Sequence, residues 1–175
     1  KCTDETSAFR YVAYEEEWKQ LGENCGWNLA IFRCSGLYGA TRSALHTIWK
    51  RGYSKLQEHG GITNRIHETD VARSITSAMN QSSCGVFNLS DDLPERRSVV
   101  NRFAVNLLES IGVEVSSPSK TTSPPSKRSK RRMSDVKLVS NHRMKTCLIN
   151  ELQFPTYREG LSSIVQNRKC PWWGC

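Results

Sequence analysis

The chain opens with the pattern of an amphipathic helix followed by a buried strand. Over residues 11–24, Trp18 and Leu21 lie on one side of a segment that is otherwise rich in glutamate, which is the spacing of a helix with one apolar side. Gly26 then indicates a turn. Residues Leu29–Phe32 are apolar without alternation, and such a run is typical of a strand covered on both faces in a parallel sheet.

Helical and strand patterns continue to alternate through the middle of the chain. Thr69 or Asp70 is a suitable cap for the exposed amides at the start of a helix. A strand followed by a helix and a further strand predicts a doubly wound α/β sheet. The sequence predicts helices over Ala44–Arg51, Asp70–Met79 and Arg97–Ile111, with a strand over Cys84–Ser90 between the last two.

Two short helical patterns close the chain. Ser140 or Asn141 can cap the first of them, and Pro155 is expected to stop it because proline lacks the amide that a helix needs. Thr156 and Glu159 stand three residues apart, which is the spacing of a capping box that starts the last helix.

Length and composition fit one domain with its own core. The chain has 175 residues, of which 37% are hydrophobic. It begins at Lys1 and contains no run near the roughly 18 apolar residues that a membrane span requires, so we expect an intracellular protein that has lost upstream sequence. The cytoplasm is the favoured compartment, with an organelle or the nucleus as alternatives. The seven cysteines form no C-x-x-C pair, which predicts reduced thiols and no metal site.

The positive charge is concentrated in one segment. Six of the net +8 charges lie between Lys120 and Arg132, which leaves the remainder at +2. The surrounding residues 116–135 are mostly serine, proline and basic residues, a composition that predicts a disordered insertion. The segment is either a solvated insertion or a nuclear-import or nucleic-acid-binding cluster, so nucleic-acid contact is predicted only through Lys120–Arg132.

Four short motifs occur in a fixed order. They are Arg33-Cys-Ser-Gly-Leu-Tyr-Gly39, the pair Arg42-Ser43, the run Arg65-Ile-His-Glu-Thr-Asp-Val-Ala72, and Glu159-Gly-Leu161. Together they resemble the C-terminal half of the extended and atypical short-chain dehydrogenases, the NAD-dependent epimerase/dehydratase superfamily. The resemblance covers the chain from about Tyr11 to Val165, interrupted by the basic insertion.

The resemblance implies a fold and a domain plan. The fold is the C-terminal part of a Rossmann-type doubly wound parallel sheet with its small helical substrate region. Residues 1–115 are then the second half of an NAD(P)-binding Rossmann-like domain, and residues 136–168 belong to the helical substrate region. The insertion 116–135 separates them, and residues 169–175 form a tail.

The resemblance also implies a site at the carboxyl ends of the strands, where open α/β sheets bind ligands. NAD or NADP would be held mainly by sequence upstream of this chain, and Ser35 and Gly36 would approach the nicotinamide, where small residues are needed. Arg42 and His46 are candidates for contacting a small or sugar-like substrate.

Four further residues are candidates for shaping the pocket, each with a structural alternative. Arg33 and Asp70 either shape the pocket or form an ion pair with each other. His67 is either a base or a hydrogen-bonded loop residue, and Tyr38 is either a pocket residue or a packing aromatic whose hydroxyl finds a partner.

The catalytic motif of the family is missing. Family catalysis uses Tyr-x-x-x-Lys, in which the lysine lowers the pKa of the tyrosine, but Tyr11 is followed by Glu15 and Tyr14 by Trp18. The catalytic residues, the substrate and the oligomeric state therefore stay open. Three functions compete: a divergent oxidoreductase or epimerase-like enzyme, a non-catalytic NAD(P)-binding-fold scaffold or sensor, and an inert body that carries a basic targeting segment.

Overall fold

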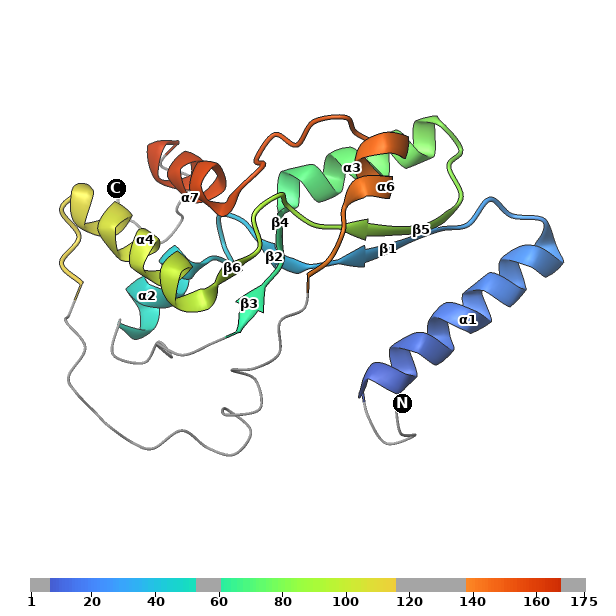
Figure 1. The fold of residues 1–175 in the computed structure, drawn as a ribbon, viewed down its shortest axis with the longest axis horizontal. Coiled ribbons are helices and arrows are strands. Elements are labelled where there is room, and N and C mark those ends of the chain that lie inside the picture. The colour runs from blue at the N-terminus through green and yellow to red at the C-terminus, as the bar shows by residue number, and fades with distance from the viewer. Residues whose placement is uncertain (1–6, 53–60, 116–137, 168–175) are drawn as a thin grey trace.

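A short pair of parallel strands forms the centre of the molecule (Figure 1). The computed structural model describes residues 7–52, 61–115 and 138–167. Strand β1 (Ala30–Cys34) pairs in parallel with β5 (Gly85–Leu89), with Ala30 opposite Gly85 and Cys34 opposite Leu89. The strands are separated by helix-containing chain, as parallel pairing requires. The predicted doubly wound α/β class is confirmed.

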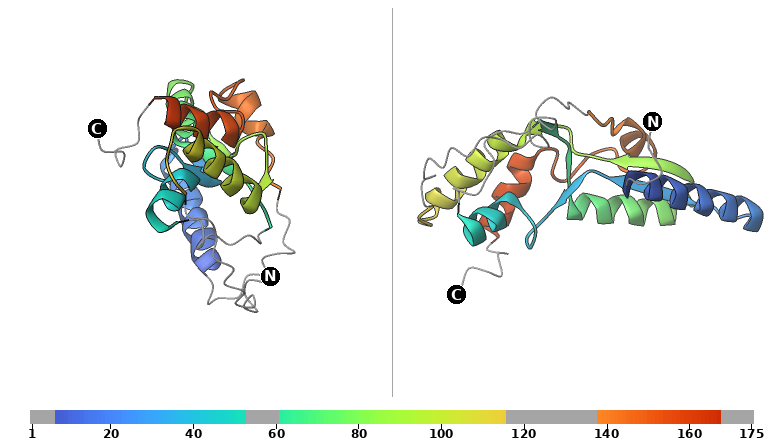
Figure 2. Two further views of the ribbon diagram at one scale, coloured as in Figure 1. Left: turned by 90° about the vertical axis from the view of Figure 1, so that its left-hand side faces the viewer. Right: turned by 90° about the horizontal axis from the view of Figure 1, so that it is seen from below.

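Helices cover both faces of this strand pair. Figure 2 shows α3 (Glu68–Asn80) on one face and α6 (His142–Cys147) on the other. Both helices contribute apolar side chains to a core that buries Phe87 and Leu89 of β5. Its buried members are Ile66, Ala78, Phe87, Leu89, Met144, Leu148, Ile149 and Leu152.

Two smaller strand pairs extend the sheet region toward the helices. Strand β2 (Gly36–Tyr38) pairs in parallel with β4 (Arg65–His67), and β3 (Ile62–Thr63) pairs antiparallel with β6 (Glu95–Arg96). The sequence patterns did not predict β2 or β4. A strand of three residues has too few positions to show an alternation of apolar and polar residues. Its pairing is set by contacts with distant parts of the chain.

A second core lies between three helices at the other end of the molecule (Figure 1). Helices α2 (Ala44–Arg51), α4 (Arg97–Ser110) and α7 (Tyr157–Gln166) pack around it. The tyrosine of β2 reaches into the same core. Its buried members are Tyr38, Leu45, Ile48, Val100, Ala104, Leu108, Tyr157, Leu161, Ile164 and Val165.

The N-terminal helix stands apart from both cores. Helix α1 (Ser7–Cys25) precedes β1, and Figure 1 shows it diverging from β1 on the side away from β5. Its large apolar side chains Tyr11, Val12, Tyr14, Trp18 and Leu21 are exposed.

The helix starts test the predicted caps. The cap of α3 is His67, whose Nδ1 accepts a hydrogen bond from the Thr69 amide at 3.1 Å, so the prediction of Thr69 or Asp70 was wrong. The capping box of Thr156 and Glu159 at the start of α7 is confirmed. Asn141 precedes α6 but makes no side-chain capping bond.

Further predictions concern the end of α6, the basic insertion, and possible metal sites and membrane spans. Helix α6 ends at Cys147, well before Pro155, so the predicted proline stop was wrong. The basic insertion 116–135 and the tail 169–175 lie outside the described residues. In the described ranges no three His, Cys, Asp or Glu side chains could hold a metal ion, and no described helix could cross a membrane.

Candidate functional site

The carboxyl ends of β1 and β5 meet at one edge. Because the two strands are parallel, Ser35 leaves β1 beside the point where Ser90 and Asp91 leave β5. The Ser35 amide donates a hydrogen bond to the Leu89 carbonyl at 2.9 Å, which continues the pairing one residue past the strand. Ligands of open α/β sheets bind at edges of this kind, and Ser35 lies at this edge; its contact with a cofactor stays a prediction.

Gly36 is exposed at the same edge, and its lack of a side chain is required there. Its amide donates to the Asn64 carbonyl at 3.1 Å, and a Cβ built on Gly36 would lie 3.0 Å from that carbonyl oxygen. A side chain here would make a tight contact that the Asn64 carbonyl has to relieve by a small shift. The glycine therefore keeps the backbone at this edge both tightly paired and open to solvent.

Tyr38 and His67 are register partners on β2 and β4, and both hold the loop before α7. The Tyr38 hydroxyl donates to the Thr156 carbonyl at 3.4 Å, as the alternative of a packing aromatic predicted. The rings of Tyr38 and His67 meet edge to face at 5.0 Å, and the His67 ring lies 4.1 Å from that of Phe154. Burial lowers the pKa of His67, which favours the neutral ring that its capping role needs.

Asp70 fixes the same loop from α3. It is fully buried, and its two carboxylate oxygens accept hydrogen bonds from the amides of Gln153 at 2.7 Å and Phe154 at 2.9 Å. The guanidinium of Arg73, one helical turn later, donates to the same carboxylate at 2.9 Å. Asp70 thus joins α3 to the segment that enters α7.

Arg33 lies elsewhere and has another partner. Its guanidinium forms a two-pronged ion pair with Glu15 on α1, with nitrogen–oxygen distances from 2.9 to 3.2 Å. Asp70 is paired with Arg73, so the alternative of an Arg33–Asp70 ion pair was wrong. The structure therefore brings Tyr38, His67 and Asp70 together but leaves Arg33 at the contact between α1 and β1.

The two candidate substrate residues lie at the start of α2. Arg42 is exposed, and its backbone closes a tight turn with Gly39 through bonds of 3.0 and 3.3 Å. His46 is half-buried in the first turn of α2, where its amide donates to the capping hydroxyl of Ser43 and its ring stacks on Trp49 at 6.2 Å. The turn therefore presents the Arg42 side chain to solvent, as a substrate-contacting residue requires.

The sequence analysis missed a buried acid beside this edge. Asp91 is 2% exposed, and burial raises its pKa to about 7, although the Arg65 guanidinium and the Leu93 amide favour the charged form. Neither its oxygens nor the Tyr157 hydroxyl meet a hydrogen-bond partner of good geometry among the described residues. The sequence could have indicated Asp91 as a site residue, since it directly follows the carboxyl end of the predicted strand Cys84–Ser90.

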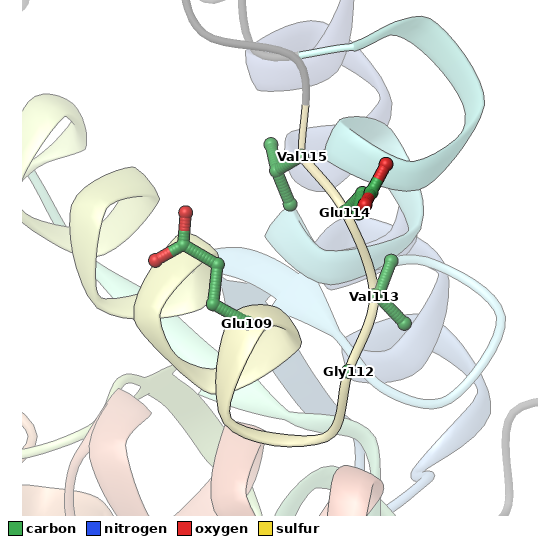
Figure 3. A pocket seen from close by; sticks show the side chains of 5 residues that line it. All are labelled: Glu109, Gly112, Val113, Glu114 and Val115. Carbon is green, nitrogen blue, oxygen red and sulfur yellow. The ribbon is translucent and has the colours of Figure 1, made fainter.

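Two open cavities lie away from Ser35, Gly36, Arg42 and His46. One, of about 460 Å³, lies along the outer side of α3 around Thr69, Arg73 and Asn80. The other, of about 490 Å³, lies at the end of α4 and is shown in Figure 3. In that view the carboxylates of Glu109 and Glu114 point in different directions, so they do not converge on one ligand. Neither cavity contains the predicted cofactor or substrate residues.

Comparison with known proteins gives structural matches only. No protein-family model and no curated protein sequence matches the chain. The UDP-glucose 4-epimerase of Thermus thermophilus, solved with NAD, matches 88% of this chain with a TM-score of 0.63 and 16% identity. A conserved Silicibacter pomeroyi protein of unknown function matches 80% with a TM-score of 0.60 and 26% identity. RMD from Pseudomonas aeruginosa, solved with NADPH, matches 86% with a TM-score of 0.57 and 13% identity.

These matches share one further property. The chain covers 50%, 49% and 51% of the three matched structures, so it spans about half the length of each. At these identities the matches show the fold, which is that of Rossmann-type NAD-binding proteins.

Proposed function

We propose that the chain is the C-terminal half of an NAD(P)-dependent oxidoreductase or epimerase-like protein that acts on a small or sugar-like substrate. The observation that carries this proposal is the match of 88% of the chain to half of an epimerase solved with NAD. The parallel pair β1–β5 supports it, because its carboxyl ends form the kind of edge at which such sheets bind ligands.

The proposal assigns a role to each end of the site. The half-buried Ser35 and the exposed Gly36 contact the nicotinamide, and Arg42 and His46 contact the substrate from the start of α2. An exposed guanidinium suits the phosphates of a nucleotide sugar, because it donates paired hydrogen bonds to oxyanions. The rest of the cofactor would be held by the half of the domain that precedes this chain.

The domain plan and the location of the protein are part of the same proposal. Residues 1–115 complete the NAD(P)-binding domain, and residues 136–168 form the helical substrate region. The protein is intracellular, with the cytoplasm favoured, and the basic segment Lys120–Arg132 serves as a solvated insertion or as a nuclear-import or nucleic-acid-binding cluster.

A second candidate is a scaffold or sensor that keeps the NAD(P)-binding fold without catalysis. The observation that favours it is the state of α1, where the family would place Tyr-x-x-x-Lys. Tyr11 and Tyr14 are exposed on this helix, and the residue four places after Tyr11 is Glu15, which is already bonded to Arg33. The residue four places after Tyr14 is Trp18, so neither tyrosine is followed by the lysine of that motif.

Calorimetric titration with NADH and NADPH tests the proposal. Residues 1–175 should show no tight binding, whereas the chain extended at its N-terminus through its own reading frame should bind one of the two cofactors. Failure of the extended chain to bind either one would refute the proposal.

A matched pair of variants tests the position of the site. Gly36→Phe should weaken binding by the extended chain, and Leu37→Phe, on the same strand but 40% exposed on its other face, should not. Circular dichroism checks that both variants fold. If UDP-glucose and bound NAD then produce no change in nicotinamide absorbance, the scaffold is favoured over the enzyme.

A further inference from the structure

Beyond the ends of β2 and β4 a glycine lies against a glutamate. The two strands are parallel and end at register partners, Tyr38 and His67. The residues that follow these partners, Gly39 and Glu68, therefore come side by side. Gly39 is buried in the loop after β2, whereas Glu68 is exposed and begins α3. Both belong to the short motifs of the sequence, but the proposed function gives neither of them a role.

The Glu68 carboxylate closes over this glycine. Its Oε1 accepts a hydrogen bond at 3.2 Å from the amide of Ala40, the residue after the glycine. A Cβ built on Gly39 would overlap the carboxylate carbon and both of its oxygens. Gly39 does not have a positive φ, so its backbone conformation is open to other residues. The space taken by the Glu68 carboxylate is therefore what excludes a side chain at this position.

The amide that Glu68 holds lies inside the turn that carries Arg42. The backbones of Gly39 and Arg42 bond to each other in both directions, at 3.0 and 3.3 Å, so Ala40 lies in the tip of the turn. The residue after the turn, Ser43, is buried and caps α2. The carboxylate on α3 therefore fixes the turn from outside, at the base of the exposed Arg42 side chain.

A glutamate in the first turn of a helix also has an ordinary role. Its charge favours the positive end of the helix dipole, and Glu68 shares the first turn of α3 with Asp70. That role needs neither a bond to Ala40 nor a glycine before it. The bond to the Ala40 amide and the fit of the carboxylate against Gly39 are therefore the observations that indicate a second role for Glu68.

We propose that Glu68 is a positioning residue for substrate binding, because it holds the Gly39–Arg42 turn in the arrangement in which the Arg42 guanidinium meets the anionic group of the substrate. The inference rests on the proposed function, in which Arg42 contacts the phosphates of a nucleotide sugar. Glu68 itself does not contact the substrate, since its carboxylate faces the turn. Its contribution is that the turn is already ordered before binding, so that less conformational freedom is lost when the substrate arrives.

Calorimetric titration of the extended chain with UDP-glucose tests this role. Arg42→Ala should weaken binding by about 10-fold or more, the loss expected when a hydrogen bond to a charged group disappears. Glu68→Ala should weaken binding by a comparable factor, because the turn no longer holds Arg42 in place. Glu68→Gln keeps an acceptor oxygen for the Ala40 amide and should retain most of the affinity. Glu109→Ala removes an exposed glutamate from α4, and as the matched control it should bind like the parent chain.

Two double variants separate a positioning role from a general effect on the structure. Gly39→Ala pushes the carboxylate away from the turn, so it should weaken binding as Glu68→Ala does, and the two together should be no worse than either one. In a chain that carries Arg42→Ala, adding Glu68→Ala should change the affinity no further, because the turn then has no guanidinium to place. Losses that multiply when Arg42→Ala and Glu68→Ala are combined would overturn the proposal.

The outcomes distinguish this proposal from the proposed function. An extended chain that binds no UDP-glucose would refute the nucleotide-sugar part of the proposed function, and the role of Glu68 would fall with it. An extended chain that binds UDP-glucose through Arg42 and loses no affinity in Glu68→Ala would refute the role of Glu68 alone. Equal losses in Glu68→Ala and Glu68→Gln would also refute that role, because the charge at the start of α3 would then be the cause. Circular dichroism checks the fold of each variant, and if Glu68→Ala does not fold, Gly39→Ala, which keeps this charge, decides the test.

Discussion

Replacing Asp70 should cost more stability than any other single change at the candidate site. Its carboxylate is fully buried and accepts hydrogen bonds from the Gln153 and Phe154 amides. Hydrogen bonds to a charged group contribute about 1.5–3 kcal/mol each, so the loss of both in Asp70→Ala should lower the free energy of unfolding by about 3–6 kcal/mol. For a chain of this size that corresponds to a fall in Tm of roughly 6–24 °C.

Two further variants separate the backbone bonds from the ion pair. Asp70→Asn keeps one acceptor oxygen but turns an NH₂ group toward the other amide, so about half of the loss should remain. Arg73→Ala removes a guanidinium that is 41% exposed and leaves both backbone amide bonds to Asp70 in place, so it should cost less than Asp70→Ala.

Urea unfolding followed by circular dichroism measures all three variants. The reasoning fails if Asp70→Ala unfolds at the same urea concentration as the parent chain. It also fails if Arg73→Ala costs as much as Asp70→Ala, because the ion pair and not the loop contact would then account for the effect.

Three other predictions follow from single contacts. Gly160→Ala should lower the free energy of unfolding in urea by about 1–3 kcal/mol, because the new methyl group would overlap the Tyr38 side chain. The loss should be smaller in a chain that also carries Tyr38→Phe, since the Tyr38 hydroxyl is the nearest group. The raised pKa of Asp91 means that the native state holds a proton more tightly than the unfolded state, so the free energy of unfolding should fall by roughly 4 kcal/mol as the pH rises from about 4 to 7. Asp91→Asn should flatten this dependence on pH. Identical pH dependence in the parent chain and the variant would contradict the raised pKa of Asp91. Arg33→Ala should leave global stability within about 1 kcal/mol but speed amide exchange in α1, and unchanged exchange there would show that the Arg33–Glu15 pair does not hold the helix.

Local sequence signals predicted much of this fold. The capping box of α7 depends on Thr156 and Glu159, which are three residues apart, and both bonds form as the spacing predicts. The apolar runs that became β1 and β5 were also readable, because strands covered by helices need apolar residues on both faces. Placing Ser35 at the carboxyl edge then required only the order of strands and helices.

Contacts between distant segments could not be predicted in this way. Arg33 finds Glu15, 18 residues earlier, because α1 runs back along β1, and a sequence with several acids offers no reason to prefer that one. His67 caps α3 through a ring nitrogen, a role for which Ser, Thr, Asp and Asn are the usual residues. The partners of Asp70 lie 83 and 84 residues away, beyond the basic insertion.

The position of the nicotinamide is the central claim, and amide chemical shifts measured while NADH is added to the extended chain test it most directly. The account predicts that the largest changes occur at Ser35 and Gly36, with little change at the exposed Met79 on α3. Changes confined to the cavity around Glu109 and Val115, with Ser35 and Gly36 unmoved, would contradict it.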